Sequence, residues 1–217
     1  MSAAAPIDPA PSAQDDLRMM RELAEEGLTR PLLSGRHLVL FGAAIALASL
    51  LHGLVMLGTL DWSPNALPVI WLGLIVPAMV VSKLWRSGER DWRPSLGHKV
   101  EKEVWQTGGA FLGIISISTL ALAYLQLDRT GETVTFYLMS MIAPVTFGVY
   151  ATALAASAAA GRVAALRPFA ALAMAFVVAT AMTAGTAMQF AVMGVGVLLV
   201  SVVPGVMLIQ RENAARG

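Results

Sequence analysis

The sequence contains no cysteine, which excludes disulfides, thiolate metal sites, iron–sulfur clusters and cysteine nucleophiles. Charged residues are scarce as well, at 13% of 217 residues, whereas soluble domains carry about 25%. Hydrophobic residues make up 57% of the chain. Because so apolar a chain must be solvated mainly by lipid, we expect an all-α integral membrane protein.

The motifs of common enzymes are also missing, since the chain has no HExxH, no GxSxG and no P-loop. No acidic pair lies inside an apolar run, so ion-coupled transport lacks its usual groups. His98, Glu101 and Glu103 stand beside lysines and match no metal-ligand spacing, and we interpret them as an exposed helix start. We therefore expect no catalytic residue, no metal, no cofactor and no enzyme. A net charge of +1 also gives no reason to expect a nucleic-acid partner.

Six apolar runs are present, and about twenty helical residues cover the ~30 Å of a hydrocarbon core. Short links join these runs, except that a long central basic loop, Lys83 to Lys102, separates the second run from the third. The sequence predicts a transmembrane domain over residues 37–210, with spans at about 38–57, 67–84, 108–125, 134–156, 169–184 and 190–209.

The basic residues divide unevenly between the links, and basic residues near span ends stay on the cytoplasmic side. With both termini in the cytoplasm, fourteen of the fifteen lysines and arginines are cytoplasmic and only Arg129 is outside. The tail at 211–217 would then be cytoplasmic. Arginine and alanine are abundant, which is typical of GC-rich bacterial genes, so we expect a bacterial inner (cytoplasmic) membrane.

The chain begins with a Pro-rich stretch at 1–11, which we expect to be a disordered tail. Residues 12–36 are predicted to form a cytoplasmic amphipathic helix, at 12–28, followed by a link, with Leu17 and Met20 on the apolar face. The central basic loop adds Arg90 and Arg93 to the same side of the membrane. These four residues form our candidate cytoplasmic interaction face.

The spans group into three hairpins, and each even-numbered span contains a proline (Pro77, Pro144 and Pro204). A triplicated two-helix unit is one interpretation. The other is that proline is common in membrane helices and that six short-looped spans always resemble three hairpins. Small residues also recur in the third and fourth spans and indicate close helix packing or a polar-lined cavity: Gly109, Gly113, Ser116, Thr119, Ala123 and Gln126, then Ser140, Pro144, Gly148, Thr152 and Ala155.

One ionisable residue, His52, lies well inside a predicted span and shares a helical face with Ser49. A neutral histidine bonded to a hydroxyl or carbonyl is the simpler interpretation, and a proton relay or ligand contact is the alternative. Together with Ser116 and Thr119 of the third span, these residues form our candidate interior polar site.

The stretch MRELAEEGLTRPLLSGRHLVLFG, Met20 to Gly42, resembles the opening of uncharacterised bacterial multi-spanning inner-membrane proteins with an N-terminal acidic amphipathic helix. The resemblance implies a membrane location. We expect a non-enzymatic membrane protein whose cytoplasmic face engages a partner or the lipid surface. The alternative is a small transporter or channel subunit that uses the Ser/Thr/His-lined interior. The lipid bilayer, a protein at the cytoplasmic face and further copies of the chain are the expected partners.

Overall fold

The computed structural model describes residues 17–18, 35–63, 65–87, 96–131, 134–161 and 163–214. The chain divides into two units, residues 1–30 and 31–217. In the first unit only Leu17 and Arg18 are described, and both are helical. Most of the expected amphipathic helix therefore lies outside the described residues. Apart from Leu17, the residues described below belong to the second unit.

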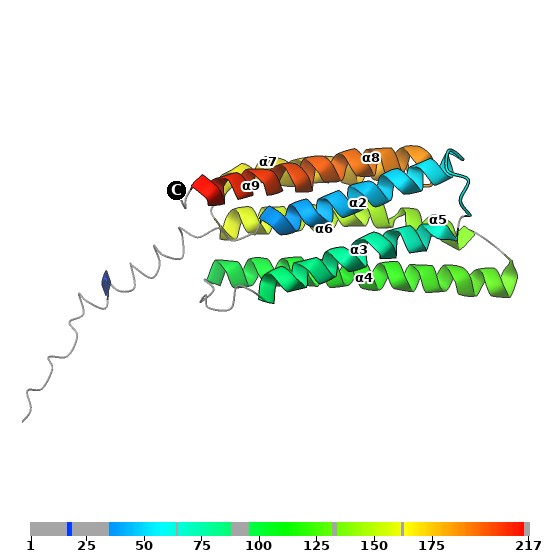
Figure 1. The fold of residues 1–217 in the computed structure, drawn as a ribbon, viewed down its shortest axis with the longest axis horizontal. Helices are drawn as coiled ribbons and strands as arrows, with labels where there is room; N and C mark the ends of the chain where they lie inside the picture. Colours follow the sequence, from blue (N-terminus) through cyan, green and yellow to red (C-terminus); the bar gives the residue numbers. More distant parts are fainter. Residues whose placement is uncertain are drawn as a thin grey trace, which may run out of the picture. The chain divides into compact units, whose positions relative to one another are not determined.

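The described residues are almost entirely helical and contain no strand. Six helical stretches are long and apolar enough to cross a membrane, which confirms the expected all-α class and the expected number of spans. Figure 1 shows these helices running side by side. The α-helices are α2 (Gly35–Met56), α3 (Ala66–Ser87), α4 (Leu96–Thr130), α5 (Val134–Ser140), α6 (Ile142–Ala160), α7 (Arg167–Met182), α8 (Ala187–Val197) and α9 (Val203–Ala214), with a 3-10 turn η1 (Ala164–Leu166) and a π-helical segment η2 (Leu198–Val202).

The helix of the third span is much longer than the sequence indicated. α4 has 35 residues, about 52 Å at 1.5 Å per residue, so it exceeds the hydrocarbon thickness and includes residues that we had assigned to the basic loop. Lys99 and Lys102 in its first turns are exposed. Because these lysines are exposed, the helix can continue through the polar residues at its start without burying their charges.

Two of the three span prolines coincide with interruptions of a helix. Pro144 lies just after the break between α5 and α6. Proline causes such a break because it has no N–H to donate to the carbonyl of residue 140 and its ring crowds that carbonyl. Pro204 follows the π-helical segment η2, in which the Val203 N–H bonds the Leu198 carbonyl five residues back. α3 continues through Pro77 as a single helix.

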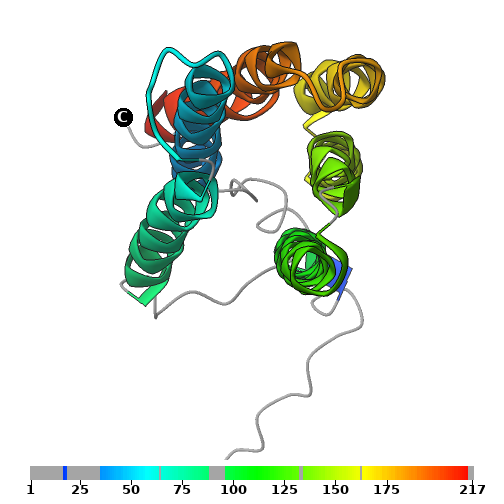
Figure 2. The same cartoon turned by 90° about the vertical axis from the view of Figure 1, so that its right-hand side faces the viewer.

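Viewed along their axes in Figure 2, the helices follow one another in the order α3, α2, α8 with α9, α7, α6 and α4. α2 packs on α3, α4 on α6, and α7 on α8. The most extensive packing nevertheless joins α6 to α7 and α2 to α8, which the sequence assigns to different hairpins. A threefold hairpin organisation therefore stays a prediction.

The core lies among α6, α7, α8 and η2, where Phe147, Leu154 and Val197 are fully buried. α2 approaches η2 and α9 through glycine: a Cβ on Gly42 would lie 2.9 Å from the Ser201 side chain. In α4, a Cβ on Gly109 or Gly113 would meet no atom within 4 Å. The small-residue stripe that we expected to mark a helix seam is therefore open there. The seam with α6 runs through Gly108 instead, whose Cβ would lie 2.7 Å from Val149.

Candidate functional site

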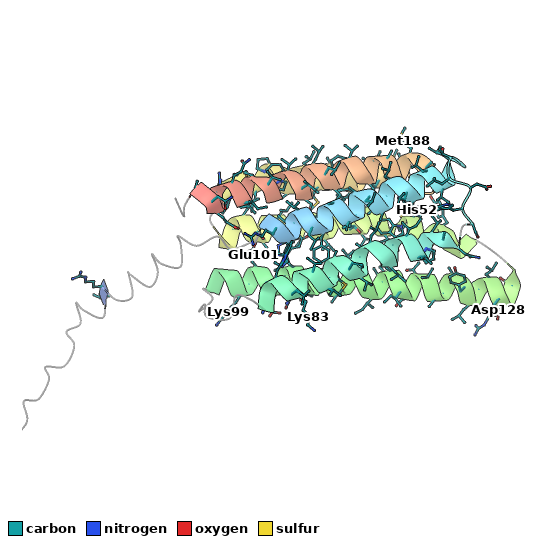
Figure 3. The ribbon with its side chains drawn as sticks, viewed as in Figure 1. His52, Lys83, Lys99, Glu101, Asp128 and Met188 are labelled. Atoms are coloured by element: carbon teal, nitrogen blue, oxygen red, sulfur yellow. The ribbon has the colours of Figure 1, made fainter. Side chains whose placement is uncertain are left out.

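His52 on α2 lies between α3 and α8 and is half-buried (Figure 3). Its Nδ1 accepts a hydrogen bond of 3.0 Å from the indole Nε1 of Trp71. Its ring stacks on Phe190, with centroids 3.6 Å apart and planes at 18°. Because an indole nitrogen can only donate, Nδ1 of His52 carries no proton in this arrangement. The partner is thus an indole, not the hydroxyl or carbonyl that we expected.

The four residues of the predicted interior site do not come together. Ser49 is fully buried on α2, and its hydroxyl has no hydrogen-bond partner. Ser116 and Thr119 lie on α4, which packs mainly on α5 and α6, whereas α2 packs on α3, α8, η2 and α9. The Thr119 hydroxyl bonds the Ile115 carbonyl of its own helix at 2.7 Å.

The candidate cytoplasmic face is represented by one residue. Leu17 is helical and 65% exposed. Met20, Arg90 and Arg93 lie outside the described residues.

A buried polar cluster surrounds the π-helical segment η2. The hydroxyl of Ser201 donates to the backbone carbonyl of Leu38 on α2 at 2.7 Å and lies 3.5 Å from the Tyr150 hydroxyl on α6. Ser201 is fully buried and Tyr150 nearly so. Three helical elements thus meet at polar groups inside an apolar bundle. π-Helical segments are rare and occur frequently at functional sites.

Glu101, near the start of α4, is the second polar feature of the interior. Only 1% of this side chain is exposed, and neither carboxyl oxygen has a hydrogen-bond partner. The interpretation of Glu101 as part of an exposed helix start is therefore wrong, although Glu103 is exposed as expected. The side chain of His98 lies outside the described part of the chain. Burying an unpaired carboxylate costs on the order of several kcal/mol, so the charged form of Glu101 is strongly disfavoured at this position.

The Glu101 carboxyl faces the hydroxyl of Ser157 on α6. Ser157 is itself buried, and its oxygen accepts a hydrogen bond of 3.2 Å from the indole Nε1 of Trp105. The Trp105 ring also meets Tyr150 edge to face at 5.4 Å. Because Trp105 occupies an acceptor position of Ser157, the Ser157 O–H remains available as a donor to Glu101.

Gln189, near the start of α8, is fully buried, although it lies between the predicted spans 169–184 and 190–209. Its amide nitrogen donates to the carbonyls of Ser140 at 2.6 Å and Thr180 at 3.0 Å, and its oxygen accepts from the Gly185 N–H at 3.2 Å. A single glutamine within a long apolar stretch is the signal that would have indicated such a role.

A groove of about 850 Å³ runs along α4, α6 and α7, and Gly108, Val149 and Val177 are among the residues that line it. Among the described residues that line it, Glu103 alone is charged. The buried polar groups described above do not contribute to this groove. Among the described residues, no group of three or more histidine, aspartate or glutamate side chains is placed to hold a metal ion.

No protein-family model, no curated protein and no solved structure matches this chain. The functional assignment accordingly depends on the residues of the chain itself.

Proposed function

We propose that this protein is a small membrane transporter whose solute passes the buried polar groups of the six-helix unit. The observation that carries the proposal is the cluster at η2, where Ser201, Tyr150 and the Leu38 carbonyl meet inside an apolar bundle. Polar groups buried in a membrane bundle face pathways and binding sites more often than lipid. In transporters, interrupted helices build such sites, because the backbone groups that they free can contact a solute.

The two interrupted helices of this chain support the same proposal. Tyr150 lies on α6, which follows the break at Pro144, and Ser201 lies in η2, which precedes Pro204. The 3.5 Å approach of their hydroxyls thus brings the two interrupted spans together at polar groups.

A swelling assay tests the transporter. Liposomes containing the purified protein are shifted into iso-osmotic solutions of single solutes (potassium, sodium and ammonium chloride, a neutral amino acid and a polyol), and swelling is followed by light scattering. We expect at least one solute to enter faster than into protein-free liposomes. Ser201→Ala should slow that entry, whereas Ser49→Ala, at an equally buried serine without a partner, should not. Equal swelling with and without protein for every solute would contradict the proposal.

The membrane and the orientation belong to the same proposal. The segregation of basic residues supports both termini in the cytoplasm, the abundance of arginine and alanine supports a bacterial inner membrane, and short links within the pairs of spans support an arrangement in three hairpins.

A cytoplasmic interaction face remains a second candidate function. Its structural support is Leu17, an apolar residue that is helical and 65% exposed. An amphipathic helix at 12–28 would bind the inner leaflet or a protein through such residues. Leu17→Asp should release the segment, and faster backbone hydrogen exchange over 12–28 would report that release. Unchanged exchange would remove this candidate.

A further inference from the structure

We propose that Glu101 is a proton-binding site inside the helical bundle, formed by its carboxyl group together with the Ser157 hydroxyl and the Trp105 indole. That this proton is coupled to solute movement depends on the transporter proposal above, whereas the binding of the proton depends only on the surroundings of Glu101.

The carboxyl group of Glu101 is buried away from water. Glu101 is 1% exposed, and within the described part of the chain neither oxygen has a partner in hydrogen-bond geometry, although the Ser157 hydroxyl faces the carboxyl. In Figure 3 it lies between α4 and the other helices, whereas Lys99 lies at the outer edge of the same helix. A carboxyl so placed is stable when neutral and unstable when charged, because a charge removed from water needs a partner.

The small number of oxygen atoms at Glu101 decides which ligand can bind there. Hard metal cations such as Ca²⁺ take six to eight oxygen ligands, and here one carboxyl and one hydroxyl face each other. Among the described residues, no group of three acidic or histidine side chains surrounds any point. A proton needs a single oxygen, so it is the ligand that this site can hold. Binding forms one O–H bond on the carboxylate and changes no other bond.

Few charged or titratable groups surround Glu101 on the helices described. α6 contributes no charged side chain, and its titratable residue is Tyr150, two turns from Ser157. α5 contributes Tyr137, and α7 contributes Arg167, which is exposed. α9 contributes Arg211, which is exposed, and Glu212, whose carboxyl accepts from the Gly35 N–H. On α4 itself Lys99, Lys102 and Glu103 are exposed. Arg90, Arg93 and Arg162 lie outside the described residues.

Ser157 and Trp105 give the site two states. When Glu101 is ionised, the Ser157 O–H can donate to the carboxylate, and Trp105 holds the serine oxygen by donating to it at 3.2 Å. When Glu101 is protonated, its own O–H becomes a donor and the serine oxygen can accept it. Trp105 is therefore a positioning residue for Ser157, and Glu101 is the group that binds the ligand.

Infrared difference spectroscopy of the purified protein during a pH titration tests the site, because the band of a protonated buried carboxyl is separate from that of a carboxylate. We expect a protonated-carboxyl band that disappears reversibly as the pH rises. Glu101→Gln should abolish this band, and Glu103→Gln, two residues later and exposed, should leave it unchanged. A band that persists in Glu101→Gln, or that is absent from the unmodified protein, would overturn the proposal.

Ser157→Ala keeps the proposal testable if Glu101→Gln does not fold. Loss of the hydroxyl removes a hydrogen bond from both states of Glu101, and the bond to the charged form is the stronger of the two, so the band should survive and its loss should move to higher pH. An unmoved midpoint would mean that Ser157 is no part of the site. The swelling assay separates the two proposals: a titrating Glu101 with no solute entry refutes the transporter and leaves the proton site standing.

Discussion

The side-chain amide of Gln189 donates a hydrogen bond of 2.6 Å to the backbone carbonyl of Ser140. In an uninterrupted helix that carbonyl would accept the N–H of residue 144, but residue 144 is proline. One glutamine of α8 therefore replaces the hydrogen bond that Pro144 removes. The break between α5 and α6 is thus a satisfied feature of the fold.

Gln189→Leu should lower the free energy of unfolding by about 1–3 kcal/mol, because buried carbonyls lose their donor without gaining water. Thermal unfolding of the purified protein measures the change. Gln106→Leu is the matched control, since Gln106 is exposed on α4 and its replacement should change stability by less than about 0.5 kcal/mol. Similar unfolding temperatures for both variants would show that the bonds of Gln189 do not stabilise the break.

The two fully buried serines of α2 and η2 offer a second comparison. Ser201→Ala removes the 2.7 Å bond to Leu38 and leaves the Tyr150 hydroxyl without that partner, so it should destabilise the protein by about 0.5–1.5 kcal/mol. Ser49→Ala removes a hydroxyl that has no partner and introduces a better helix former, so stability should stay the same or rise. Equal losses from the two substitutions in thermal unfolding would contradict the assignment of Ser201 as the bonded serine.

Particular residues show how far the sequence could predict this structure. The six spans follow from apolar runs, because the length that lipid requires is visible in the sequence. The breaks were not predictable, since α3 tolerates Pro77 whereas α5 and α6 separate at Pro144. Whether a proline interrupts a helix depends on what replaces its missing hydrogen bond, and here that group is Gln189, 45 residues further along.

The candidate site was predicted less well than the spans. His52 lies half-buried between α3 and α8, but its indole partner comes from a different helix, and no pattern in α2 indicates it. Glu101 was missed because the neighbouring lysines dominate its segment. The periodicity of Glu101, Trp105 and Gly108, which follows the seam with α6, was recognisable only once Trp105 and Ser157 were seen in contact.

Because the chain contains no cysteine, single cysteines can report the orientation without background. Figure 1 shows the link after α2 and the end of α4 at one end of the helices, and the end of α9 at the other. Cysteines at Ser63 and Thr130 should therefore label with an impermeant reagent from outside intact cells. Cysteines at Ser95, outside the described residues, and at Asn213 should label only after lysis. Labelling of a cysteine at position 213 in intact cells would contradict the predicted topology.

His52 gives the last prediction, because its contacts separate a structural role from a transport role. Gln can still accept from Trp71, so His52→Gln should lose only the stacking on Phe190, whereas His52→Leu leaves the Trp71 N–H unpaired at a cost of about 1–3 kcal/mol. Combining His52→Leu with Trp71→Phe should recover part of that cost, since the unpaired donor is removed.

Thermal unfolding of the single and double variants measures this coupling, and the swelling assay is run on the same samples. With Nδ1 committed to Trp71, we expect His52→Gln to keep the solute entry rate of the unmodified protein. A stable His52→Gln variant that no longer admits solute would contradict the structural role. It would place His52 on the transport path, because such a variant keeps its stability and its hydrogen bond from Trp71 and still loses transport.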